Sequence, residues 1–206
     1  MKKEYIKLLG VWLQPDCGWE KNTQELCKKA YARMSMLTKL KYAGVCTEEL
    51  INIYKQYIRG TLEYCSVAFS SSLTAQQSAS LERCQAVALR IILSESYISY
   101  SAALEMCGID LLEKRRLARC LQYSLKCTNH PQNARYFPLN PNLFGEQHVR
   151  YRERYKVNFS RTKQYQKSTI PFCQRLLNSH DAQQQKEREE REEESEEGEE
   201  DGEEGG

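Results

Sequence analysis

Apolar side chains recur at helical spacing through the middle of the chain. In residues 19–40 they fall every three, four or seven positions, and Gly44 follows as a stop. Further on, Thr74 and Gln77 have the spacing of a capping box, which opens one long apolar stripe. The stripe consists of Leu81, Cys84, Ala88, Ile91 and Ile92. Both patterns predict amphipathic helices that pack through one face.

Shorter helices are predicted around these two. Thr47, followed by two glutamates, marks the start of a helix that runs through Ile58. Residues 101–106 form a short helix closed by Gly108. Asp110 and Glu113 then start a helix whose buried face is predicted to comprise Leu117, Leu121 and Leu125.

The two ends of the chain differ from its middle. Residues 5–13 are apolar and aromatic and predict one short strand. Residues 181–206 contain Gln, Glu and Gly with no apolar anchor, which predicts disorder. We therefore expect a mainly α protein, a helical bundle with a short N-terminal strand and a disordered acidic C-terminal tail. The predicted parts are the strand at 1–16, helices at 17–128, an irregular basic and aromatic segment at 129–180, and the tail at 181–206.

Charge is divided sharply along the chain. Before residue 181 there are 27 Lys and Arg against 14 Asp and Glu, whereas residues 181–206 hold 3 basic against 14 acidic residues. A basic body attracts polyanions, of which nucleic acid is the commonest. The tail is expected to be solvated, to bind basic proteins, or to compete with nucleic acid for the body.

Nine cysteines at irregular spacing argue against a disulfide framework and favour a reducing, intracellular compartment, either nucleus or cytoplasm. We expect no secretory signal after Met1 and no membrane span, because no run of 18 apolar residues occurs.

A succession of short motifs runs along the predicted helices. They are Lys7-Leu8-Leu9-Gly10-Val11, Tyr57-Ile58-Arg59, Leu62-Glu63-Tyr64, Leu73-Thr74 with Gln77, Leu81-Glu82 with Gln85, Ala88-Leu89-Arg90-Ile91-Ile92, Tyr100, Ala103-Leu104, Gly108-Ile109, Leu112 with Arg115-Arg116, Lys167-Ser168, Ile170-Pro171 and Leu177-Asn178. In this order they resemble the region that follows the polymerase palm in reverse transcriptases of jockey-like non-LTR retrotransposons.

The resemblance implies a palm and thumb junction strand at residues 1–16, a thumb-like bundle after it, and a surface that meets a template-primer duplex. Gly60 stands where the family often has Pro, Phe69 where it often has Trp, and the acidic tail has no counterpart there. Leu8, Val11 and Trp12 would lie exposed without a palm, which invites a missing palm domain or another protein as partner.

Polymerisation needs clustered carboxylates that hold two metal ions. The family's Asp-Asp pair is absent from this sequence, and Asp16 and Asp110 are the only aspartates before the tail. We therefore expect a truncated fragment that is no enzyme by itself and that uses no cofactor. Cys120, Cys127 and His130 have the wrong spacing for a zinc site, so buried thiols are favoured and no metal is expected.

Two groups of basic residues are the candidate nucleic-acid contacts. On the first helix they are Lys28, Lys29, Arg33, Lys39 and Lys41, and in the C-terminal segment Arg150, Arg152 and Arg154. The first group either meets a phosphate backbone or forms a solvated helix face. The second group continues along the chain with Lys156, Arg161, Lys163 and Lys167. These basic residues interleave with four aromatic ones, Tyr151, Tyr155, Phe159 and Tyr165. The composition suits phosphate contacts with base stacking, but also an unpacked connector whose tyrosines rest on the bundle.

Arg115 and Arg116 lie in the first turns of a helix, where cations are unfavourable, so a salt bridge to Glu82 or Glu105 is predicted ahead of a nucleic-acid contact. The expected function is weak, sequence-independent binding of RNA or RNA:DNA hybrid, with no membrane partner. The alternative is a helical protein-interaction module with an acidic tail.

Overall fold

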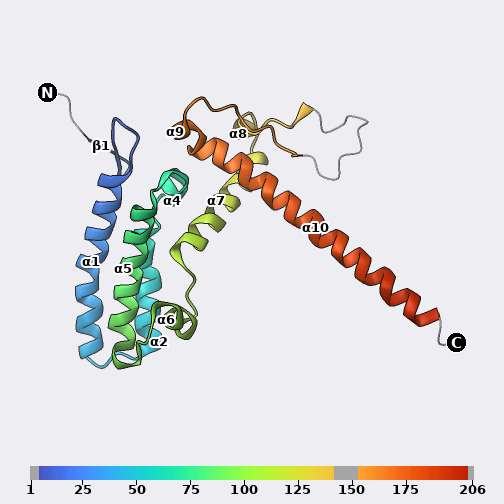
Figure 1. Cartoon of the computed structure of the whole chain (residues 1–206). Helices are drawn as coiled ribbons and strands as arrows, with labels where there is room; N and C mark the ends of the chain where they lie inside the picture. Colours follow the sequence, from blue (N-terminus) through green and yellow to red (C-terminus); the bar gives the residue numbers. More distant parts are fainter. Residues whose placement is uncertain (1–4, 142–152, 204–206) are drawn as a thin grey trace. The chain divides into compact units, whose positions relative to one another are not determined.

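The computed structural model describes residues 5–141 and 153–203, with side chains as far as residue 191. The chain is mainly helical, as predicted, and it divides into two compact units, Met1–Cys120 and Leu121–Gly206 (Figure 1). Among the helices described, none is long and apolar enough to cross a membrane.

The N-terminal apolar run forms a hairpin rather than the single strand predicted for it. Strands β1 (Ile6–Leu8) and β2 (Val11–Leu13) pair antiparallel, with Ile6 opposite Leu13. Leu9 and Gly10 connect them with φ values of 46° and 84°, which is the backbone of a tight two-residue hairpin turn. The run therefore supplies its own pairing partner, which the helical remainder does not offer.

Helices α1 (Glu20–Tyr42) and α5 (Ala75–Leu93) run side by side and carry most of the core of the first unit (Figure 1). Leu26, Ala30, Met34 and Leu37 form the buried stripe of α1. The helix ends as predicted, because Gly44 adopts φ +84° and its N–H donates to the carbonyl of Lys41. The N–H of Val45 reaches the carbonyl of Leu40, which completes a Schellman cap.

The second predicted helix extends further than expected. Helix α2 (Thr47–Ile53), the π-helical turn η1 (Tyr54–Ile58) and α3 (Arg59–Leu62) follow one another without a break. Cys46 precedes α2 and makes no side-chain cap, so Thr47 is not the capping residue predicted. Helix α4 (Ser66–Phe69) and the 3-10 turn η2 (Ser70–Ser72) then lead to α5.

The capping box before α5 is confirmed. Thr74 Oγ1 accepts from the N–H of Gln77 at 3.2 Å, and Gln77 Oε1 accepts from the N–H of Thr74 at 2.9 Å. Leu81, Cys84, Ala88 and Ile92 are fully buried and Ile91 is half-buried against the same core, so the predicted stripe is also the packed one. After the 3-10 turn η3 (Ser94–Ser96), α6 (Tyr100–Cys107) ends at Gly108 as predicted.

Helix α7 (Leu112–Thr128) turns a different face inward from the one predicted. Leu117 and Leu125 remain 46% and 38% exposed, whereas Leu121, the third predicted position, is half-buried and packs against the core of the second unit. The buried positions are Leu112, Arg116, Cys120, Ser124 and Cys127. Arg116 is 3% exposed there, and its Nη2 donates to Ser78 Oγ at 2.7 Å, a non-local partner that leucine spacing does not reveal.

The second unit is built on the start of a long helix. It contains helices α8 (Pro131–Ala134), α9 (Lys163–Gln166) and α10 (Thr169–Glu203). An isolated antiparallel β-bridge joins Leu139 to Tyr155. The core side chains are Cys127, Phe137, Tyr155, Cys173 and Leu177. Asn178 on α10 holds Tyr155 by accepting from its N–H at 2.8 Å and donating to its carbonyl at 2.9 Å. Irregular backbone is thus fixed by side-chain amides.

Helix α10 continues into the acidic tail as far as Glu203. Glu, Gln, Lys and Arg have high intrinsic helix propensity. Side-chain pairs one turn apart add to this, including Lys186 with Glu190 at 3.5 Å and Gln183 with Glu187 at 3.2 Å.

Candidate nucleic-acid interface

The five basic residues predicted on the first helix all lie on α1, but they do not share a face. Lys28 and Lys39 are exposed and eleven residues apart, which is about three turns or roughly 16 Å along one side of the helix. Lys29 is also exposed and points about 100° away from Lys28. Spacing along the chain therefore places three lysines on two strips of the surface.

The other two residues of the set turn toward the bundle. Arg33 Nη1 donates to the carbonyl of Tyr57 at 2.6 Å and to Thr61 Oγ1, and its guanidinium lies 4.3 Å from the centre of the Tyr57 ring. Lys41 Nζ donates to the carbonyl of Ile92 at 2.7 Å. Lys41 therefore joins α1 to the end of α5, and its ammonium has a structural role.

Lys29 and Arg33 come together in a groove of about 320 Å³ within the first unit. Its other lining residues are Gly10, Leu26, Gly60, Thr61 and Tyr64. We call it the Lys29 groove. Tyr64 donates its hydroxyl to the carbonyl of Leu9 at 2.8 Å, which fastens the hairpin turn to the wall of the groove.

The chemistry of the Lys29 groove suits an anion. Lys29 and Arg33 both line it, and an ammonium and a guanidinium are donors that bind phosphate oxygens. Gly60 contributes no side chain, and a Cβ built there meets nothing within 4 Å, so the wall is open at that point. The sequence did not assign Gly10, Gly60 or Tyr64 to this site, because only tertiary packing brings the hairpin and the end of α3 beside α1. The one available signal is Gly60 at a position where the resembled family often has Pro.

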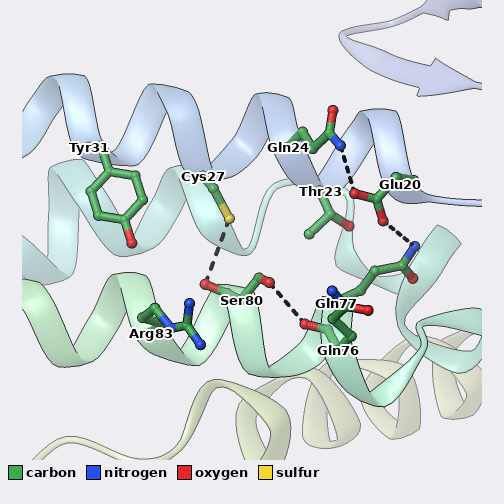
Figure 2. Close-up of a pocket in the computed structure, with 9 residues that line it drawn as sticks. All are labelled: Glu20, Thr23, Gln24, Cys27, Tyr31, Gln76, Gln77, Ser80 and Arg83. Carbon is green, nitrogen blue, oxygen red and sulfur yellow. Dashed lines mark hydrogen bonds between the residues drawn. The ribbon is translucent and has the colours of Figure 1, made fainter.

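A second cavity, of about 240 Å³, lies between α1 and α5 (Figure 2). Figure 2 shows the Glu20 carboxylate between two amides, accepting from Gln24 Nε2 at 2.7 Å and from Gln77 Nε2 at 3.3 Å. Arg83 also lines this cavity, but none of the basic residues predicted from sequence does. The bond from Gln77 ties α5 to α1, whereas Gln24 lies on α1 with Glu20.

The thiol in this second cavity is a poor nucleophile. Cys27 Sγ lies 3.7 Å from the carbonyl of Ser80. The neighbouring Cys84 and burial together raise the pKa of Cys27, so its thiol stays protonated. Burial first and then Cys84 raise the pKa of Tyr31 to about 12. Neither group carries charge near neutral pH.

In the second unit, Arg154 is engaged with the acidic tail. Its guanidinium lies 3.9 Å from Asp181 Oδ2 and 5.5 Å from the centre of the Tyr155 ring. The side chain is 57% exposed, so it remains open to solvent on one side. Arg150 and Arg152 lie outside the described residues.

The aromatic residues of the C-terminal segment divide into two kinds. Tyr155 is buried and meets Phe137 edge-on, with 6.4 Å between ring centres. Phe159 and Tyr165 are 85% and 45% exposed. Tyr151 lies outside the described residues. One aromatic residue of the segment therefore packs and two face solvent, and base stacking on this segment stays a prediction.

Arg115 forms the structural salt bridge predicted for it, but with a different carboxylate. Glu63, with a side chain only 1% exposed, accepts from Arg115 Nε at 2.5 Å and from its Nη2 at 3.2 Å. Arg119 Nη2 adds a contact of 2.9 Å to the same carboxylate. The predicted partners Glu82 and Glu105 were wrong, because the turn after α3 brings Glu63 beside α7.

Glu82 instead serves a network inside the bundle. One carboxylate oxygen accepts from the Tyr100 hydroxyl at 2.6 Å, and the other accepts from the N–H of Glu113 at 2.7 Å. Gln85 links Tyr100 to Tyr54, with bonds of 2.9 and 2.5 Å. Glu82, Gln85 and Tyr100 belong to the motifs that carry the family resemblance. In this structure these three residues form hydrogen bonds that hold the bundle together.

Cys120 and Cys127, the two cysteines weighed as zinc ligands, are both buried thiols. Within residues 5–141 and 153–191, no group of three or more His, Cys, Asp or Glu side chains is arranged to hold a metal ion.

Comparison with known proteins found no match: no family model, no curated protein and no solved structure resembles the chain significantly. The resemblance to jockey-like reverse transcriptases therefore stays a prediction from the motifs. The candidate interface rests on the residues of the chain itself, chiefly the Lys29 groove and the exposed lysines of α1.

Proposed function

We propose that this chain is a nucleic-acid-binding region equivalent to the thumb and C-terminal part of a non-LTR reverse transcriptase. It binds RNA or RNA:DNA hybrid weakly and without sequence preference. The Lys29 groove is the observation that carries the proposal, because it joins two cations beside a glycine that leaves room for a phosphate backbone.

The charge distribution supports a weak and salt-sensitive interaction. Lys28, Lys29 and Lys39 are exposed on α1, while Arg33 contributes one edge of an already bonded guanidinium. Three or four phosphate contacts of this kind release few counterions, and none of them reads a base. Affinity in the micromolar range at low salt is therefore expected.

Within this proposal the chain does not polymerise by itself. Phosphoryl transfer by two metal ions requires carboxylates that converge on one point. The sequence has no Asp-Asp pair, and the exposed Asp110 is paired with Lys114 at 2.9 Å. A template-dependent extension assay with the chain alone and with a separately supplied palm domain tests this part.

Fluorescence anisotropy with labelled RNA:DNA hybrid, single-stranded RNA and duplex DNA over a salt series tests the binding. The variant K28E/K29E should weaken binding to the hybrid and flatten its dependence on salt. K114E/K126E is the matched control, since it makes the same change of charge at two exposed positions of α7. The proposal fails if no probe binds at low salt, or if the two double variants behave alike.

The hairpin favours the second candidate function, a protein-interaction module. Ile6, Leu8 and Leu9 are 62%, 57% and 85% exposed, whereas Val11 is buried, contrary to the expectation that it lies open. Exposed apolar side chains on a two-stranded sheet suit a protein partner, such as a palm domain. Leu9→Asp should abolish such an interface and leave RNA binding unchanged, while K28E/K29E should do the reverse. Co-sedimentation with the palm domain measures the first effect.

A further inference from the structure

Phe159 is the most exposed aromatic residue of the second unit's described part, at 85%. An exposed phenylalanine needs no explanation by itself. Its surroundings distinguish it, because Tyr165 is 45% exposed and Lys156, Arg161 and Lys163 are exposed around it in the chain. We call these five residues the Phe159 surface.

The backbone that carries the Phe159 surface is anchored to α10 on both sides. On one side the N–H of Asn158 donates to Gln174 Oε1 at 3.0 Å, and Gln174, fully buried, also donates to the carbonyl of Tyr136 at 2.8 Å. On the other, Arg175 Nη2 donates to the carbonyl of Gln166 at 2.5 Å. A segment held in this way loses little conformational freedom when it binds a ligand.

Local capping adds to this order. The Thr162 hydroxyl accepts from the N–H of Tyr165 at 3.2 Å and so starts α9. The Ser168 hydroxyl donates to the carbonyl of Tyr165 at 2.7 Å at the other end of that turn. The backbone that carries Tyr165 is therefore held in one turn. Phe159 lies outside the core, between the bonded backbone of Asn158 and this turn.

The charge around these rings is strongly positive. Residues 153–168 contain five Lys and Arg against one acidic residue, Glu153. Exposed rings among cations fit a ligand that combines a polyanionic backbone with flat apolar faces. Single-stranded nucleic acid has both, because its bases are free to stack, whereas the faces of duplex bases are covered by their neighbours.

We propose that the Phe159 surface is a second binding site, which takes single-stranded nucleic acid by stacking bases on Phe159 and Tyr165 while Lys156, Arg161 and Lys163 neutralise phosphates. The site lies wholly in the second unit and uses no residue of the Lys29 groove. It stands whether or not the first unit binds a hybrid duplex.

The test uses the full chain and a single-stranded oligonucleotide that carries 2-aminopurine, whose fluorescence is quenched when the base stacks. Wild-type protein should quench the probe. Phe159→Ala and Tyr165→Ala should each weaken binding by roughly 5- to 150-fold and reduce the quenching, because base stacking on an aromatic side chain is worth about that factor. The salt dependence should stay unchanged in both, since no cation is removed.

Tyr42→Ala is the matched control, because Tyr42 is an 88% exposed aromatic residue beside a lysine in the first unit. It should change neither affinity nor quenching. Arg161→Gln with Lys163→Gln should also weaken binding but, unlike the aromatic variants, should lower the salt slope by about 0.7 for each phosphate that is no longer neutralised.

Unchanged affinity and quenching in Phe159→Ala would overturn the proposal. So would equal losses for the oligonucleotide and for heparin, a polyanion without bases, because a base-stacking site must distinguish them. The hybrid-binding proposal fails separately: if K28E/K29E leaves hybrid binding intact while Phe159→Ala abolishes quenching, only the Lys29 groove is refuted. Circular dichroism checks that each variant is folded.

Discussion

Replacing Glu63 by Gln should destabilise the first unit through its most buried ion pair. The Glu63 carboxylate is 1% exposed and is shared by Arg115 and Arg119. Removing one member of a buried pair typically costs about 3–5 kcal/mol, because the remaining charge is stranded. Here Arg115 and Arg119 are 26% and 43% exposed and can turn toward water, so we expect a smaller loss of about 2–3 kcal/mol.

Thermal unfolding followed by circular dichroism measures this loss. For a unit that extends from Met1 to Cys120, 1 kcal/mol corresponds to about 3–6 °C, so the loss of about 2–3 kcal/mol should lower the midpoint by roughly 6–18 °C. A double-mutant cycle with Arg115→Met should show strong coupling, because both changes break the same contact. A loss below about 0.5 kcal/mol for Glu63→Gln would refute the reasoning. Arg115→Met should leave RNA affinity unchanged, and a clear loss there would revive a nucleic-acid role for Arg115.

The remaining predictions concern the caps and the buried tyrosines. A Cβ added at Gly44 or at Gly60 would meet nothing within 4 Å, so only the backbone conformation separates the two positions. Gly44→Ala should cost about 1–2 kcal/mol because φ is +84° there, whereas Gly60→Ala, in helix α3, should stabilise by up to about 1 kcal/mol. Chemical denaturation measures both changes. Thr74→Ala should cost about 1 kcal/mol by opening the capping box, and no change would contradict the role of the Thr74 hydroxyl. Burial raises the pKa of Tyr54 and of Tyr100 above the ordinary value of 10, so the unfolded chain ionises first and stability should fall as pH rises above about 10. Tyr54→Phe should reduce that loss in an alkaline titration followed by circular dichroism, and an identical pH profile would exclude Tyr54 as a cause.

Local features of this fold were predictable from sequence because their causes are local. The Thr74 capping box and the Gly44 and Gly108 stops each depend on residues within one turn of the chain. The α5 stripe is similarly clear, because its apolar residues repeat at helical spacing on one face. The mainly helical class follows from these signals together.

The N-terminal hairpin could not be predicted from local signals alone. The Leu9-Gly10 step is visible in the sequence, but the apolar run around it also fits a single strand. Pairing of β1 with β2, and the Tyr64 bond that fastens the turn, depend on contacts that the run alone does not specify.

The candidate site, too, was determined partly by the sequence and partly by the tertiary structure. The sequence alone determined which residues of α1 are basic and that they lie on one helix. Tertiary structure decided that Arg33 and Lys41 bond to neighbouring carbonyls, that Glu63 rather than Glu82 holds Arg115, and that Lys29 faces a groove with Gly60. Charge and periodicity are properties of the local chain, whereas the partner of a charged side chain is chosen by which distant backbone folds beside it.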